Sequence, residues 1–324
     1  MASHDSDAEE AITKEEIEGT APAPVPTTSG GSQATSKRNA FTELMSPRAK
    51  IPATANFYHR SSIKPTSFSS RDGLGAYIAD PASFPASRVI YHSEHFVAIN
   101  DMYPKSSVHT LLLPRDARWN KLHPFDAFSA SPPSSASRNP QGQPGKSGDE
   151  EARRAFLALV QAEAQRLKIL VAKELQRKFG KFSAQDRLRK SVLNDEVPWD
   201  PETPLPRGRD WEAEVLVGVH ARPSMNHLHI HVLSRDMFSE CMKHRKHYNS
   251  FNTPFLIDAA DFPLKGGDGH GDGDKAGEDP RLHPGKAGYM DSDLKCWRCG
   301  RNFGNKFKQL KEHLAEEFEE WKRE

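Results

Sequence analysis

The stretch 227–233 has the sequence His-Leu-His-Ile-His-Val-Leu. Side chains of a β-strand alternate between its two faces, so this pattern predicts a strand with three histidines on one face. Leu228, Ile230 and Val232 would then point into a core. Imidazole can act as a nucleophile, a proton carrier or a metal ligand near neutral pH. Three imidazoles on one face therefore favour phosphoryl chemistry or metal binding over a run of solvated histidines.

The segments around this stretch predict further strands and a long helix. Apolar and β-branched residues predict strands at 89–91, 96–99, 108–113 and 215–219, and the first two are close enough to form a hairpin. Apolar residues recur at helical spacing over 150–179.

Composition divides the chain into folded and unfolded parts. Its 324 residues are 36% hydrophobic and 27% charged. Segments rich in Ser, Pro, Gly and charge cannot bury enough apolar area to offset the loss of chain entropy. We therefore predict a disordered tail over 1–66, a domain over 67–260 with a disordered insertion at about 129–149, a flexible linker over 261–290 and a small module over 291–324.

Charge and cysteine content narrow the class of protein. The net charge is +1, so a nucleic-acid surface would have to come from local clustering of basic residues. The three cysteines are too few for a disulfide framework and suit a reducing compartment. The N-terminus has no apolar signal region, and no uncharged apolar run approaches the ~20 residues of a membrane span. We expect an intracellular protein that does not contact membranes.

The last module has the ligand spacing of a zinc finger. Cys296 and Cys299 form a C-x-x-C pair, followed by His313 and Glu317 on a predicted helix, which gives C-x2-C-x13-H-x3-E. Glutamate replaces the usual second histidine, and a carboxylate oxygen is an accepted zinc ligand. Glu316 is the rival for the fourth position, and two reduced cysteines beside an ordinary helix are the alternative to a metal site. A segment this short needs a metal to fold, so we predict one structural zinc in a ββα-like finger.

Basic residues gather in the same module. The stretch 295–311 contains six Lys or Arg residues and no acidic residue. A second cluster follows the histidine stretch, where Lys243, Arg245 and Lys246 alternate with histidines and Tyr248. Such surfaces suit a phosphate backbone, although a solvated basic face is the alternative. Backbone contacts do not read sequence, so we expect binding to DNA nicks and ends and not to a sequence motif.

The histidine stretch resembles the signature of the HIT (histidine triad) nucleotide hydrolases and transferases. Its surroundings resemble the aprataxin branch of that family, whose fungal members carry a finger with two cysteines, one histidine and one glutamate. The resemblance covers about 70–260 and the finger, and it implies the α+β class, with an antiparallel HIT sheet flanked by helices and the finger beside it. The matching segments are Asp-Met-Tyr-Pro-Lys at 101–105 with His109, Leu-Leu-Leu-Pro at 111–114, Val-Gly-Val-His at 217–220, Pro-Ser-Met-Asn at 223–226 and Lys-His-Tyr-Asn-Ser-Phe at 246–251.

The resemblance implies a role for each matching residue in the HIT domain. His229 would be the nucleophile that attacks the phosphorus of AMP, and His220 would assist the departing DNA phosphate. The remaining residues would contact the phosphate (His227, His231, Ser224) or the nucleoside (Asp101, Tyr103, Lys105, His109). A carboxylate suits the ribose diol because it accepts two hydrogen bonds. No metal is needed at this site.

The resemblance also implies a function. The chain would remove AMP from 5′-adenylated DNA ends left by abortive ligation, through a covalent histidine–AMP intermediate, and would act in DNA repair in the nucleus. We expect a monomer, whose tail over 1–66 is a candidate contact for repair proteins. The expected DNA contacts are Lys243, Lys246, His247, Ser250, Lys295, Trp297, Arg298, Arg301, Lys306 and Lys308, with Phe68 as the aromatic that stacks on the DNA end. The alternatives are a general hydrolase of dinucleoside polyphosphates or AMP-amidates and a non-enzymatic DNA-binding protein.

Overall fold

The computed structural model describes residues 70–129, 147–265 and 279–324. The predicted tail over 1–66, Phe68 and most of the predicted insertion lie outside the described residues. The described chain forms an antiparallel sheet with helices and a small C-terminal module, so the predicted α+β class is confirmed. Among the described helices, none combines the length and apolar composition of a membrane span.

Six strands of the described chain form one sheet in the order β1-β2-β3-β5-β4-β6, with every neighbouring pair antiparallel. The strands β3 and β5 lie at its centre, where His109 pairs with Leu233 and Leu111 pairs with His231. Their central position places histidines from two distant segments side by side. The strand bounds are β1 (Val89–His92), β2 (Phe96–Asn100), β3 (His109–Pro114), β4 (Val215–His220), β5 (Ile230–Ser234) and β6 (Leu256–Asp258).

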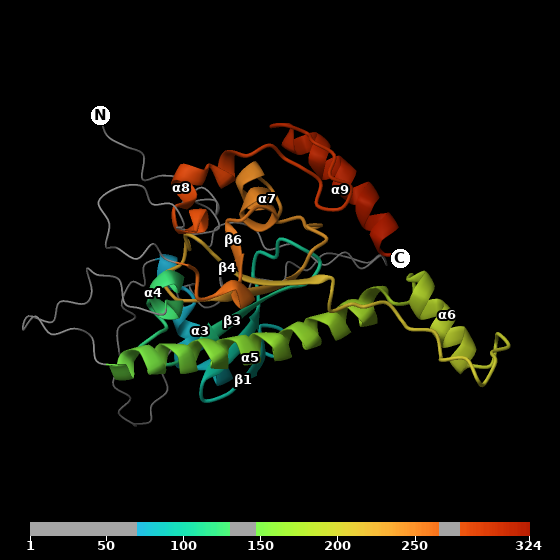
Figure 1. The fold of residues 1–324 in the computed structure, drawn as a ribbon, viewed down its shortest axis with the longest axis horizontal. Coiled ribbons are helices and arrows are strands. Elements are labelled where there is room, and N and C mark those ends of the chain that lie inside the picture. Colours follow the sequence, from blue (N-terminus) through green and yellow to red (C-terminus); the bar gives the residue numbers. More distant parts are fainter. Residues whose placement is uncertain (1–69, 130–146, 266–278) are drawn as a thin grey trace, which may run out of the picture.

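The long helix α5 (Ser147–Phe179) runs across one face of the sheet (Figure 1). Its predicted apolar stripe, from Phe156 to Leu175, is buried in the core beneath it. The other described helices and helical turns are η2 (Ser70–Asp72), α3 (Gly75–Ala79), η3 (Pro81–Ser83), α4 (Pro124–Phe128), α6 (Ala184–Leu193), α7 (Arg245–Asn252), η4 (Ala259–Asp261), η5 (Pro280–Leu282), α8 (Pro284–Ala287), η6 (Tyr289–Asp291) and α9 (Phe307–Trp321).

The strand β5 separates two cores. Ile230 and Val232, with Leu228 just before the strand, pack under α5 as the alternation predicts. Leu233 points to the opposite side, where it packs with residues of α7 and α9, including Tyr248. The C-terminal module is thus built onto the face of the sheet that carries the histidines.

Two expectations about local structure differ from the observed fold. The strand begins at Ile230, because the Leu228 amide donates to the carbonyl of Asn120 (2.8 Å) and not to a neighbouring strand. The second half of the predicted linker over 261–290 is folded into η5, α8 and η6. Met290 of this segment is buried, and its carbonyl accepts from Asn249 Nδ2 of α7 (3.1 Å).

Candidate histidine site and metal centre

Five histidines from three strands and their connections converge on one site. His109 lies on β3, His220 ends β4, and His227, His229 and His231 lie before and within β5. The ring centroids of His220 and His231 are 4.4 Å apart, and those of His229 and His231 are 4.9 Å apart. All five side chains are buried. The alternation in sequence thus brings the three predicted histidines together, although only His231 lies inside the strand.

The protonation state of the central ring is set by a backbone group. His229 Nδ1 lies 2.8 Å from the carbonyl oxygen of His227, which can only accept a hydrogen bond. Nδ1 therefore carries the hydrogen, and Nε2 keeps a free lone pair. Burial lowers the pKa of His229, against the opposing effects of this hydrogen bond and of Asp101. His229 is thus a neutral imidazole with Nε2 ready to act as a nucleophile.

Two hydrogen bonds fix the tautomers of His109 and His231. The Lys105 amide donates to His109 Nδ1 (3.1 Å), so His109 Nε2 carries a hydrogen that it donates to His231 Nδ1 (3.0 Å). The remaining nitrogen of His231, Nε2, is then a donor, and it has no hydrogen-bond partner among the described residues. Burial lowers the pKa of His109 to about 4, which agrees with a neutral ring. A buried donor without a partner is costly unless a ligand supplies an acceptor.

An ionised carboxylate lies beside this pair. Asp101 Oδ1 accepts from the Tyr103 amide (2.8 Å), and Oδ2 lies 3.4 Å from His109 Nδ1. Burial works to raise the pKa of Asp101, but His109, Lys105 and the Tyr103 amide outweigh it and hold the pKa below its usual value. Potential metal-ligand atoms of Asp101, His109 and His231 lie within 4.8 Å of one another, yet the His109–His231 hydrogen bond already occupies two of the ring nitrogens.

The remaining predicted residues line the same site. His220 packs its ring against Phe251 at a centroid distance of 4.7 Å, and its Nε2 has no hydrogen-bond partner among the described residues. Burial holds the pKa of His220 well below its usual value. Ser224 is buried, and its carbonyl accepts from Arg71 Nε (2.7 Å), which fixes the loop after β4.

Two contacts at this site could not be predicted from the histidine pattern at 227–233. Asn226 Nδ2 donates to Asp72 Oδ1 (2.8 Å), so the turn η2 is fastened to the loop before the histidines. A Cβ atom added to Gly75 would lie 2.9 Å from His227 Cε1, closer than real Cβ atoms approach a neighbour. Gly75 therefore lets the start of α3 lie directly against the first histidine of the stretch.

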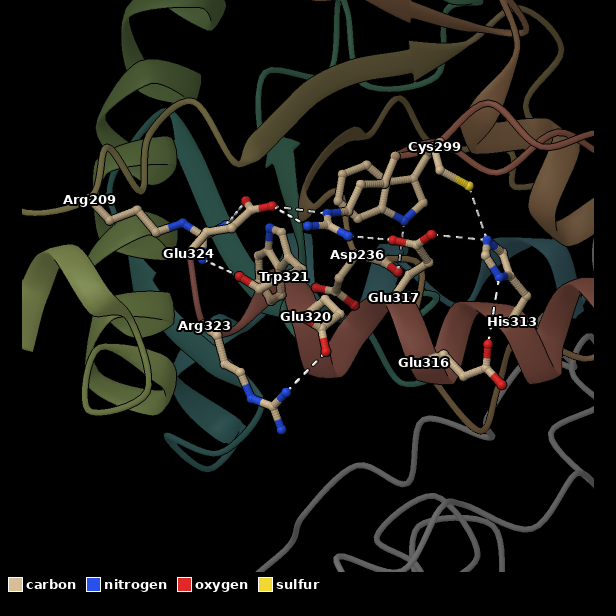
Figure 2. A network of polar contacts seen from close by, with 12 residues as sticks. Arg209, Asp236, Cys299, His313, Glu316, Glu317, Glu320, Trp321, Arg323 and Glu324 are labelled. Atoms are coloured by element: carbon tan, nitrogen blue, oxygen red, sulfur yellow. Dashed lines mark hydrogen bonds and ion pairs between the residues drawn. The ribbon is translucent and has the colours of Figure 1, made fainter.

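The C-terminal module gathers the four predicted metal ligands. The donor atoms of Cys296, Cys299, His313 and Glu317 lie within 4.8 Å of one another. His313 Nε2 is 3.1 Å from both Cys299 Sγ and Glu317 Oε1 (Figure 2). Two thiols, one imidazole and one carboxylate are a donor set typical of zinc, so the residues fit that ion. Glu316 lies 3.8 Å from the other ring nitrogen, and its side chain is 80% exposed, so Glu317 and not its rival belongs to the cluster.

The predicted DNA contacts divide into two groups. The exposed group comprises Lys243, Lys295, Arg301, Lys306 and Lys308, and Lys246 is partly exposed. His247 and Ser250 of α7 are buried, so their contact with DNA stays a prediction that the outer surface does not support. Arg298 is exposed, but its guanidinium pairs with Glu317 and Glu324 within the chain, so its contact with DNA stays a prediction.

Trp297 is engaged within the chain as well. Its indole Nε1 donates to the carbonyl of Asp236 (3.2 Å), and the guanidinium of Arg235 lies 5.3 Å from its ring centroid. The side chain thus joins the finger to the loop that follows β5. The contact with DNA that the sequence predicts for Trp297 would involve the part of its ring that remains exposed to solvent.

Comparisons with known proteins agree with this geometry. Residues 85–238 match the HIT domain, and residues 252–320 match the C2HE / C2H2 / C2HC zinc-binding finger. The chain is 32% identical over 249 residues to an aprataxin-like protein of Saccharomyces cerevisiae, which covers 76% of this chain and 95% of that protein. It is 29% identical over 255 residues to an aprataxin-like protein of Schizosaccharomyces pombe, covering 78% of this chain and 82% of that protein.

Comparison with solved structures also identifies aprataxin relatives. The crystal structure of the aprataxin ortholog Hnt3 in complex with DNA matches with a TM-score of 0.52 and 27% identity, over 78% of this chain and 96% of that one. A structure of Hnt3 in complex with DNA and guanosine matches with a TM-score of 0.50 and 26% identity, over the same shares of the two chains. With a buried histidine cluster on a HIT domain and a Cys-Cys-His-Glu finger packed beside it, the chain belongs to the aprataxin-like family.

Proposed function

We propose that the chain is a DNA deadenylase that hydrolyses the AMP–phosphate anhydride at 5′-adenylated DNA ends. The observation that carries this proposal is the arrangement of ring nitrogens in the histidine site. His229 presents an unprotonated Nε2. The ring of His231 lies next to it, the ring of His220 lies next to His231, and each of these two rings has a partnerless Nε2. That set offers a nucleophile and hydrogen-bonding groups for a phosphoryl centre within one buried site.

In the first step, His229 Nε2 attacks the phosphorus of the AMP moiety. A P–N bond forms, and the bond between that phosphorus and the bridging oxygen breaks, so its electron pair leaves with the 5′-phosphate of the DNA. His231 Nε2–H stabilises a non-bridging oxygen, with His227 and Ser224 at the same phosphoryl group. Asp101 stays ionised and accepts hydrogen bonds from the ribose hydroxyls.

In the second step, water attacks the phosphorus of the histidine–AMP adduct. The P–N bond breaks, and its electron pair returns to His229 Nε2. The proton released by water passes to His220 Nε2. Burial keeps this ring neutral by lowering its pKa, and its hydrogen bond to the Ser250 backbone leaves the partnerless Nε2 as the accepting nitrogen. AMP and a DNA end with a 5′-phosphate are the products, and that end is again a substrate for ligation.

The surroundings of the site support DNA as the substrate class. Structures of the aprataxin ortholog Hnt3 have been solved with DNA bound, and the exposed Lys295, Arg301 and Lys306 of the finger lie in a stretch, 295–311, that contains no acidic residue. Contacts of this kind hold the phosphate backbone and suit nicks and ends. Zinc would be held by the finger ligands as a structural ion, and the nucleus is the proposed location because the substrate is there.

AMP release tests the proposal with the full-length chain. The substrates are nicked DNA with a 5′-adenylate and a free dinucleoside polyphosphate. The variant His229→Ala should lose at least about 10³-fold of the activity, because no other group can replace the nucleophile. The exposed His95→Ala is the matched control and should retain full activity.

Each outcome has a distinct meaning. Preference for adenylated DNA, together with an AMP adduct on wild-type protein quenched during turnover, supports a deadenylase. A strong preference for the free dinucleotide would instead indicate a general HIT hydrolase. Binding of DNA without release of AMP from either substrate would contradict an enzymatic role.

A further inference from the structure

A buried arginine lies where the finger helix meets the HIT domain. The Arg209 guanidinium lies 4.5 Å from the ring centroid of Trp211 and 4.8 Å from that of Trp321. Its side chain is only 4% exposed. Arg209 and Trp211 belong to the segment before β4, whereas Trp321 ends α9. One cation is therefore held between an indole of the HIT domain and an indole of the finger.

The same arginine satisfies groups from both parts of the chain. Its Nη1 donates to the carbonyl of Trp321, and its Nη2 lies 3.4 Å from Glu324 Oε2 (Figure 2). The same Nη2 lies 3.2 Å from Glu214 Oε1. Glu214 also accepts from the indole Nε1 of Trp321 (2.7 Å). A cation at the last carbonyls of a helix is favoured by the helix dipole. We call Arg209, Trp211, Glu214, Trp321 and Glu324 the Arg209 clamp.

The clamp also joins two helix ends through their backbones. The Ala184 amide donates to the carbonyl of Arg323 (2.8 Å), and the Gln185 amide donates to the carbonyl of Glu324 (3.4 Å). Two first-turn amides of α6, which lack partners inside their own helix, are thus bound by the chain that follows α9. Asp186 of α6 accepts from the indole Nε1 of Trp211 (2.7 Å).

Ion pairs extend the clamp to the metal centre. Arg298, between the two cysteine ligands, pairs with Glu317 and with Glu324. Glu324 in turn pairs with Arg209, while the other carboxylate oxygen of Glu317 faces His313. A zinc ion bound to Glu317 would hold that carboxylate in place. Because Arg298 pairs with both Glu317 and Glu324, the position of Glu324 would then be restricted as well.

We propose that Arg209 is a positioning residue that fixes the finger helix α9 on the HIT domain, and that bound zinc completes this clamp through Glu317, Arg298 and Glu324. The part of the inference that concerns catalysis rests on the proposed function. A finger held at one angle keeps its basic surface at a constant distance from the histidine site. Arg209 would thereby act on the capture of a DNA substrate without contacting it.

Hydrogen–deuterium exchange on the full chain tests the clamp without any assay of activity. Arg209→Met should speed exchange of the Ala184 and Gln185 amides by about tenfold or more, because their acceptors move away. Amides of the paired strands β3 and β5 should stay protected, which shows that the domain remains folded. Arg207→Met is the matched control, since Arg207 is exposed and lies two residues away. Unchanged exchange at Ala184 in Arg209→Met would overturn the clamp.

Removal of zinc by a chelator tests the link to the metal. The wild-type chain should then show the same faster exchange at Ala184, and adding zinc should reverse it. Faster exchange confined to 295–320, with Ala184 unaffected, would contradict the coupling through Arg298. Arg209→Lys keeps the charge but not the planar stacking, so it should fall between wild type and Arg209→Met.

Kinetic constants measured on two substrates test the positioning role of Arg209. Arg209→Met should raise KM for adenylated nicked DNA by about tenfold with little change in kcat, and should leave hydrolysis of a free dinucleotide unchanged. Equal losses on both substrates would mean that the substitution only destabilises the fold. If wild-type protein releases no AMP from DNA, the proposed function fails, while the exchange measurements still decide the clamp.

Discussion

At the scale of single residues, backbone groups decide what each histidine can do. The carbonyl of His227 holds the hydrogen of His229 on Nδ1, and the amide of Lys105 holds that of His109 on Nε2. Neither backbone group can exchange its role as acceptor or donor. The nucleophilic nitrogen is therefore specified before any substrate arrives, which is the kind of preorganisation that lowers a reaction barrier.

The lowered pKa of His229 predicts the acid limb of the reaction. The nucleophile must be unprotonated, and burial lowers its pKa below the ordinary 6.5, so activity should persist to lower pH than an exposed histidine would allow. We expect the acid-side midpoint of kcat/KM for adenylated DNA below pH 6.5. A pH–rate profile measures it, with protein folding checked at each pH. A midpoint above 6.5 would show that Nε2 is not the group that titrates.

The residues of the site were predictable from sequence to different degrees. Spacing alone predicts the three histidines and the two cysteines, because period-two and C-x-x-C patterns are local. The roles of Gly75 and Arg298 were not predictable, since each depends on a contact with a distant part of the chain, His227 in one case and Glu324 in the other. Basic character alone cannot distinguish a residue that binds phosphate from one that pairs with a carboxylate.

At the scale of elements, the finger depends on one helix with two functional faces. Leu310, Leu314 and Trp321 of α9 are buried against the rest of the protein, while His313 and Glu317 face the cysteines. The helix therefore serves both as the wall of the metal centre and as the contact with the HIT domain. A substitution of the metal ligands on α9 should therefore also alter the packing of this helix against the HIT domain.

Adjacent glutamates on α9 offer a matched test of the metal centre. Glu317→Ala should lower the zinc content from one ion per chain and weaken its retention by about 10-fold to 100-fold against a chelator, because a ligand is removed. Glu316→Ala should retain wild-type zinc, since that side chain is exposed and lies apart from the cluster. Metal analysis after dialysis measures both variants. Loss of zinc in Glu316→Ala alone would assign the fourth ligand to Glu316.

Elements with a strong apolar pattern followed the sequence, whereas two short elements without one, α7 and β6, did not. The helix α5 and the strands β1 to β5 lie close to the predicted positions, because each has a strong apolar pattern. The helix α7 has eight residues and no side-chain cap, and β6 has three residues, so neither has a local signal. The segment 280–291 was predicted as part of a linker, and its last turn, η6, packs against α7.

At the scale of the whole molecule, the buried histidines make folding sensitive to acid. Burial lowers the pKa of His109 to about 4 and that of His247 to about 2, and it also lowers the pKa values of His220, His229 and His231. The unfolded chain titrates these groups near 6.5, so it binds more protons than the folded chain below that pH. Stability is therefore fully present above about pH 6.5 and is lost as the pH falls.

The size of this effect can be measured by denaturation. Each such histidine should cost about 1.4 kcal/mol of unfolding free energy per pH unit between 6.5 and its folded pKa. His109 and His247, with pKa values of about 4 and about 2, alone predict a fall of about 2 kcal/mol between pH 6.5 and 5.5, and the other three histidines act in the same direction. Urea unfolding at pH 7.5, 6.5 and 5.5 gives the comparison. Equal stability at all three values would mean that the cluster is already protonated in the folded state or accessible to water.

The docking of α9 on the HIT domain also gives the protein an optical signal. Of the five tryptophans in the sequence, Trp211 and Trp321 flank Arg209, and Trp297 binds the loop after β5. Emission from an indole shifts to longer wavelength when water reaches it, so separation of the finger should redden the intrinsic fluorescence. Undocking can thus be followed in real time on unlabelled protein.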